Sequence, residues 1–88
     1  MEFMVHFERY IFAGMVRYCI DIAGTSISGG VTEQRTGGYA WFLRYPDGEW
    51  AGDGVAGSWG GMLDDIRRAL AMDATHGRLS YLRRNAAP

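Results

Sequence analysis

A glycine-rich stretch, GDGVAG at residues 52–57, has the glycine spacing of a cofactor-binding motif. It matches the G-x-G-x-x-G of a dinucleotide-binding turn, where glycines let the backbone approach a pyrophosphate. Such a site also needs a parallel strand–helix–strand unit and an acidic residue about 20 positions further on. Asp73 has roughly this spacing but falls at the end of a predicted helix, and Asp53 would place a carboxylate beside the pyrophosphate. We therefore interpret the stretch as a connection from sheet to helix and expect no cofactor.

The histidines and the cysteine do not form a recognisable catalytic or metal-binding set. His6 and His76 are far apart in the sequence and lack further ligands at metal-binding spacing. Cys19 is the only cysteine, and only His6, across a predicted hairpin, could act as its base. Asp64 and Asp65 are adjacent on a predicted helix, so their side chains diverge by about 100° and cannot share a proton. The sequence predicts no metal site and no enzymatic activity.

Charge is strongly segregated along the chain, although the net charge is only −1. Residues 1–44 carry four acidic residues and four arginines, whereas residues 45–66 carry five acidic residues and no basic one. An acidic surface of this kind can oppose a basic groove on a partner protein, and an exposed tryptophan within it can anchor the contact. The predicted partner-binding residues are Asp47, Glu49, Trp50, Asp53, Asp64 and Asp65.

The opposite charge lies in residues 67–88, which carry five arginines and one acidic residue. Arginines clustered in this way can contact nucleic-acid phosphates. The alternative nucleic-acid-binding residues are Arg67, Arg68, Arg83 and Arg84. The sequence pI of about 6.0 argues against direct nucleic-acid binding, since such domains are usually strongly basic.

Side chains alternate between apolar and polar faces in two runs, residues 2–12 and 15–23, and this alternation predicts antiparallel strands. Ala13-Gly14 between them predicts a tight turn. Residues 24–30 are predicted as a loop. Further strands are predicted at 31–36, 39–45 and 49–52, with turns at Gly37-Gly38 and Pro46-Asp47-Gly48. On the second strand, Val16, Tyr18, Ile20 and Ile22 are expected on one face, and Arg17, Cys19 and Asp21 on the other.

A helix is predicted to follow Ser58, whose hydroxyl can cap its first turn. Asp64 and Arg68 have the spacing of a favourable ion pair on the helix surface. Gly77 is expected just after the helix, and residues 78–82 as a short last strand or an extended tail. The apolar stripe of the helix comprises Trp59, Met62, Leu63, Ile66, Ala69 and Leu70.

These elements predict an α+β fold, an antiparallel sheet of four to five strands with one helix packed on one face. The 88 residues suit one domain over residues 1–84, with residues 85–88 as a disordered tail. A single cysteine favours a reducing compartment, and the mixed N-terminus has neither a signal sequence nor a membrane span. We therefore expect a cytoplasmic protein.

In its size, layout, local acidic patch and lack of catalytic residues, the chain resembles the phage-encoded anti-CRISPR inhibitors, a group with diverse folds and no shared motif. The resemblance implies a non-enzymatic inhibitor that binds a bacterial CRISPR–Cas surveillance complex or nuclease and blocks DNA binding or cleavage. Two alternatives remain: a nucleic-acid-binding accessory protein that uses the arginine-rich end, and a small antitoxin-like regulator that forms a homodimer.

Overall fold

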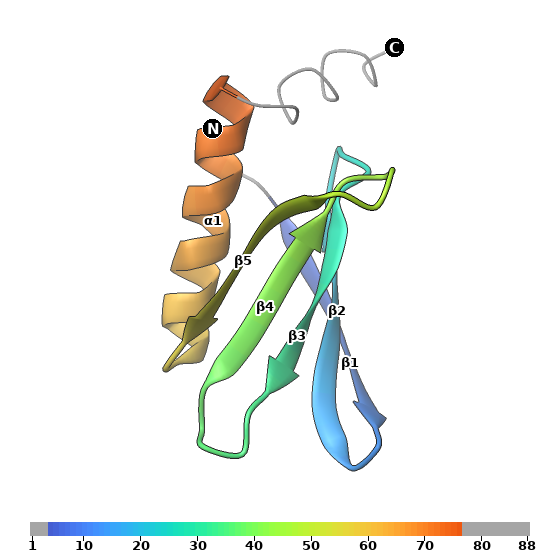
Figure 1. The fold of residues 1–88 in the computed structure, drawn as a ribbon, viewed down its shortest axis with the longest axis vertical. Coiled ribbons are helices and arrows are strands. Elements are labelled where there is room, and N and C mark those ends of the chain that lie inside the picture. Colours follow the sequence, from blue (N-terminus) through green and yellow to red (C-terminus); the bar gives the residue numbers. More distant parts are fainter. Residues whose placement is uncertain (1–3, 77–88) are drawn as a thin grey trace.

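The computed structural model describes residues 4–76, which form five strands and one helix and confirm the predicted α+β class (Figure 1). The sheet is an antiparallel meander in the order β1-β2-β3-β4-β5, so each strand pairs with the one before it. β1 and β5 are therefore the two edges of the sheet. The elements are β1 (Val5–Phe12), β2 (Met15–Ile22), β3 (Ser28–Glu33), β4 (Tyr39–Arg44), β5 (Trp50–Ala56) and α1 (Trp59–His76).

The β1–β2 hairpin forms as the alternation predicted. Ala13 and Gly14 have φ angles of 53° and 76°, as a two-residue turn with the twist of the strands requires. Phe7 pairs with Ile20, which is buried, while Cys19 on the opposite face is exposed. The predicted division of β2 into an apolar and a polar face is therefore confirmed.

The third strand differs from the prediction, because β3 runs over Ser28–Glu33 and not over residues 31–36. Its first part was expected to be a loop because of Gly29 and Gly30. Both glycines instead allow a close approach to β4. A Cβ on Gly29 would overlap the Phe42 carbonyl oxygen, and one on Gly30 would lie 3.0 Å from Cε1 of the Phe42 ring.

The two later turns form where they were predicted. Gly37, with a φ of 96°, lies in the β3–β4 turn, where Gln34 N donates to the Gly38 carbonyl at 2.7 Å. In the β4–β5 turn, Gly48 N donates to the Tyr45 carbonyl at 2.9 Å, and the Asp47 carboxylate accepts a hydrogen bond from Glu49 N at 3.0 Å.

The helix begins as its cap predicts, since Ser58 Oγ accepts a hydrogen bond from Gly61 N at 3.0 Å. Its last residue is His76, immediately before Gly77, as expected. The predicted Asp64–Arg68 ion pair is wrong. Arg68 Nη1 lies 3.6 Å from Asp65 Oδ1 instead, because the helix also brings residues three apart together.

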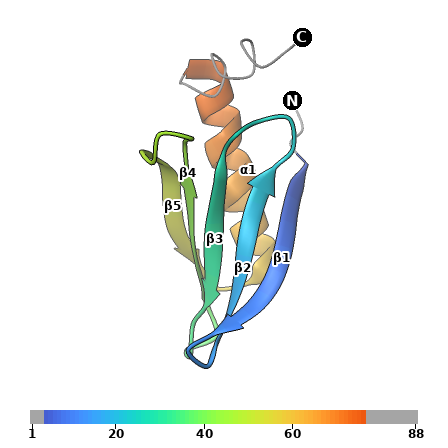
Figure 2. The same ribbon diagram turned by 90° about the vertical axis from the view of Figure 1, so that its right-hand side faces the viewer.

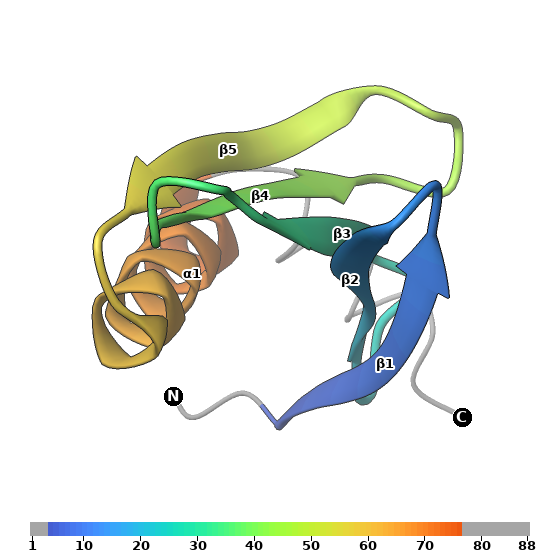
Figure 3. The ribbon, with the colours of Figure 1, turned by 90° about the horizontal axis from the view of Figure 1, so that it is seen from below.

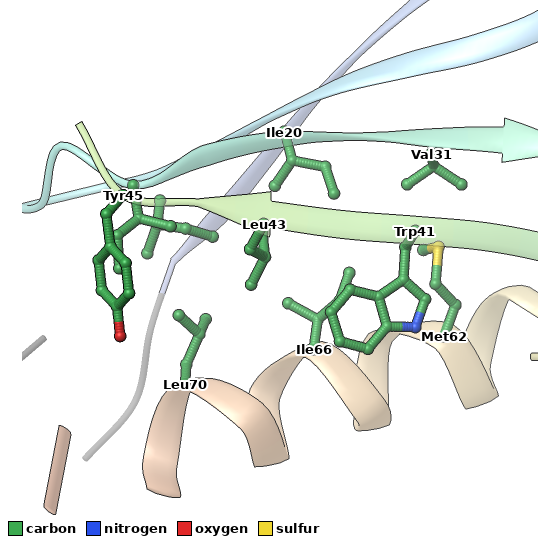
Figure 4. Packing of buried hydrophobic residues seen from close by; sticks show 10 residues of the cluster. Ile20, Val31, Trp41, Leu43, Tyr45, Met62, Ile66 and Leu70 are labelled. Atoms are coloured by element: carbon green, nitrogen blue, oxygen red, sulfur yellow. The ribbon is translucent and has the colours of Figure 1, made fainter. Parts of the chain in front are cut away.

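The core lies between α1 and one face of the sheet (Figure 4). Met62, Ile66 and Leu70 project from the helix toward Trp41 and Leu43 of β4, and all five are almost completely buried. The spacing of the three helical residues at four-residue intervals produces this stripe. Seen from below, the sheet curves around the side on which α1 lies (Figure 3).

An aromatic cluster closes the core where the helix begins. The ring of Trp59 has its centroid 4.8 Å from those of Phe7 and Tyr18 and 5.5 Å from that of Tyr39. Beyond this cluster the β1–β2 turn extends past the start of α1 (Figure 2). Ile11 at this end consequently stays exposed, at 64%, whereas Phe12 is 60% exposed because it lies on the outer face of the sheet.

Candidate functional site

The first five residues of the glycine stretch, 52–56, lie in strand β5, so their interpretation as a connection from sheet to helix is wrong. The predicted return strand of residues 49–52 was too short for the same reason. A Cβ on Gly54 would lie 2.9 Å from Trp41 Nε1, and one on Gly52 would lie 3.6 Å from Trp41 Cζ3. The glycines therefore make room for a buried indole beneath the strand. A strand that pairs antiparallel with β4 does not present the backbone of a phosphate-binding loop.

The outer face of the sheet, opposite α1, carries a cluster of two aromatic rings and one guanidinium, formed by Phe42, Trp50 and Arg44. The two rings are in contact edge to face, with centroids 5.3 Å apart. The Arg44 guanidinium lies 4.8 Å from the Trp50 ring centroid and 5.4 Å from that of Phe42. Trp50 is nevertheless 56% exposed, as predicted from its place beside an acidic turn. An exposed aromatic side chain packed against its neighbours in this way can act as an anchor in a protein interface.

Asp53 lies beside this cluster, since it pairs with Phe42 across β4 and β5. A shallow hollow there is lined by Phe42, Trp50, Asp53 and Val55, together with residues next to them in β4 and β5. Val55 is 66% exposed. A hollow with apolar walls and one carboxylate can accept a partner side chain that is cationic, or one that has both an apolar and a cationic part.

The other predicted acidic residues are not gathered on this face. Asp47 and Glu49 lie in the turn before β5, and Asp64 and Asp65 lie on α1. The acidic residues therefore do not form one continuous patch. Those of the turn lie at one end of β5, and those of α1 lie on the inner side of the sheet.

Asp65 lies on the side of α1 that faces β5. It occupies the same row of the helix as Gly61 and Ala69, since the three are four residues apart. At either end of this row, a Cβ on Gly61 would lie 3.7 Å from Ala56 Cβ, and one on Gly52 would lie 3.6 Å from Ala69 Cβ. Asp65 therefore lies along β5, between these two contacts. Asp64 is about 100° further round the helix and is exposed.

The predicted arginine surface is only partly described. Arg67 and Arg68 are exposed on α1, while Arg83 and Arg84 lie outside the described residues, as do the expected last strand of residues 78–82 and the tail of residues 85–88. On the sheet, a second arginine stacks on an aromatic ring, because the Arg17 guanidinium lies 5.2 Å from the Phe12 ring centroid. This contact is diagonal, since Phe12 pairs with Met15 and Arg17 pairs with Tyr10.

The thiol of Cys19 is exposed but does not face His6 directly. In the hairpin register Cys19 pairs with Glu8, and His6 pairs with Asp21. Within residues 4–76, no group of three or more histidine, cysteine or acidic side chains is placed to hold a metal ion. In the same part of the chain, α1 does not have the long apolar stretch needed to cross a membrane.

Comparison with known proteins adds no assignment. No family model matches the chain, and no match was found among curated proteins or solved structures.

Proposed function

We propose that the protein is a non-enzymatic protein-binding module whose contact surface centres on Trp50, on the outer face of β4 and β5. The observation that carries this proposal is an exposed tryptophan held in place by Phe42 and Arg44. A side chain that is already packed against its neighbours loses less conformational entropy when a partner covers it than a free one does. Large aromatic anchors beside a charged rim are typical of the energetic centre of an interface.

The outer face suits a protein better than a nucleic acid. It carries Arg17 and Arg44, but Glu8, Asp21 and Asp53 lie on the same face. Carboxylates interspersed in this way oppose the phosphate contacts that dominate nucleic-acid affinity. Both arginines are also engaged with aromatic rings of the same chain.

We further propose that the partner is a bacterial protein complex, and specifically a CRISPR–Cas surveillance complex or nuclease. The chain's small size, its layout and its charge segregation support this narrower proposal. It predicts that a tagged chain captures a multi-subunit complex from bacterial lysate, and that the capture survives nuclease treatment. Recovery of nuclease-sensitive material alone would contradict it and would favour the arginines of residues 67–88.

The protein-binding proposal is tested by comparing Trp50→Ser with Phe12→Ser in this capture experiment. The two side chains are similarly exposed, at 56% and 60%, but lie at different places on the sheet. Loss of an anchor worth about 1.4 kcal/mol or more should weaken binding by about tenfold or more for Trp50→Ser. Phe12→Ser should bind normally. Equal binding by both variants would refute the contact surface proposed here.

A further inference from the structure

Strand β5 offers a free edge for a further strand. It is the last strand of the sheet, so within residues 4–76 the outward-facing N–H and C=O groups of its second side have no strand partner. Figure 3 shows α1 on the inner side of the sheet, so the helix does not take the place of a strand beyond β5. The helix also packs chiefly against β5 and less against β4. An added strand would therefore extend the sheet at this edge, with α1 on the inner side of the neighbouring strand β5.

This edge is flanked by carboxylates on both of its faces. Asp53 projects from the outer face, because it shares a register with Phe42. Asp65 lies on the helix side, in the row that runs along β5. Its ion pair with Arg68, at 3.6 Å and with the arginine side chain 72% exposed, is of the kind that contributes little. Residues 45–66, which contain the whole of β5, have five acidic residues and no basic one.

The helix side of the edge also offers an apolar contact. Met72 follows Asp65 by seven residues, so it lies on the same side of α1, and it is 65% exposed. Side chains on one face of an incoming strand would thus meet Asp65 and Met72. Those on its other face would meet Asp53, Val55 and Trp50.

We propose that β5 binds an extended segment of the partner by strand pairing, and that this segment carries adjacent basic residues. Two neighbouring residues of a strand point to opposite faces, so one would reach Asp53 and the next Asp65. This inference rests on the proposed protein-binding function and names the chemistry of the partner. A second copy of the chain is disfavoured on this edge, since pairing β5 with β5 would bring carboxylates together.

The test uses a capped hexapeptide of two adjacent arginines flanked by valines and threonines, titrated into the isotopically labelled full chain. We expect amide shifts along β5 and a measurable dissociation constant. A peptide with glutamates in place of the arginines should not bind. A third peptide, with the same side chains but methylated alternate backbone nitrogens, should bind at least tenfold more weakly, because strand pairing needs its N–H groups.

Two pairs of variants locate the contact. Asp53→Asn and Asp65→Asn should each lower the affinity for the arginine peptide severalfold. The matched controls Glu8→Gln, on the same sheet face at the opposite edge, and Asp64→Asn, further round the same helix, should leave its affinity unchanged. All four variants change the charge by the same amount, so a uniform effect would show non-specific attraction and overturn the proposal.

Three other results would also overturn strand pairing. One is peptide binding that N-methylation does not change. Another is shifts confined to residues away from β5. The third is nuclear Overhauser contacts between β5 and the chain's own residues 78–84 without peptide, which would show the edge already occupied. None of these outcomes affects capture of a partner through Trp50, so the proposed function would stand or fall separately.

Discussion

The two ends of the sheet are built in different ways. At the β5 end, glycines replace side chains so that the strand can lie directly on Trp41, and α1 covers the inner face. At the β1 end, the strand carries a side chain at every position, and its outer part extends beyond the helix with Ile11 and Phe12 exposed. Close packing at one edge and exposure at the other therefore have one cause, since α1 packs chiefly on β5 and leaves the outer part of the β1–β2 hairpin uncovered.

The link between the two ends is Trp59, and its removal should have the largest effect. Trp59→Ala deletes the ring that contacts Phe7, Tyr18 and Tyr39. We expect a loss of about 3 kcal/mol in the free energy of unfolding, as for other large aromatic truncations. Amide exchange should rise more in β1 than in β4, because β4 keeps the contacts of Trp41 and Leu43 with the helix.

The matched control for this variant is Trp50→Ala. It removes the same side chain from an exposed position and should cost less than about 1 kcal/mol in urea unfolding. A similar loss in both variants would show that Trp59 does not hold the two ends together.

The glycines of β5 provide the next test. Gly54→Ala places a methyl group 2.9 Å from Trp41 Nε1 and 3.1 Å from two other indole atoms. The indole is buried under β5 and cannot retreat freely, so we expect destabilisation by about 1–3 kcal/mol. Gly52→Ala is the control, since its methyl group would meet the same ring at an ordinary 3.6 Å. Thermal unfolding should show little change for this second variant, or a slight gain, because alanine has less freedom in the unfolded chain.

The difference between these glycines also marks what the sequence could reveal. Alternation predicted the β1–β2 hairpin with its faces, and Ser58 predicted the start of the helix, because both signals are local. Gly52 and Gly54 suggested an interruption, since glycine normally weakens a strand. That they lie inside β5 depends on Trp41 occupying the space beneath them, which is a contact between strands.

The candidate site shows the same limit. Exposure of Trp50 followed from its position beside a polar turn, and the acidic character of residues 45–66 was evident from the sequence. The approach of Asp65 to the β5 edge could not be predicted, because it requires the direction in which α1 crosses the sheet. Likewise, the irregular pairing between Leu43 and Arg44, close to Trp50, has no local sequence signal.

The smallest effect is expected at the exposed end of the hairpin. Ile11→Thr keeps a β-branched side chain at a position that is 64% exposed, so the free energy of unfolding should change by less than about 0.5 kcal/mol. The same substitution at Ile20, which is 1% exposed on the neighbouring strand, should cost several times more because it buries a hydroxyl in an apolar core. Urea unfolding of the two variants measures the contrast directly. If Ile11→Thr were as damaging as Ile20→Thr, the outer part of the hairpin would be covered in solution, and the difference between the two ends of the sheet would disappear.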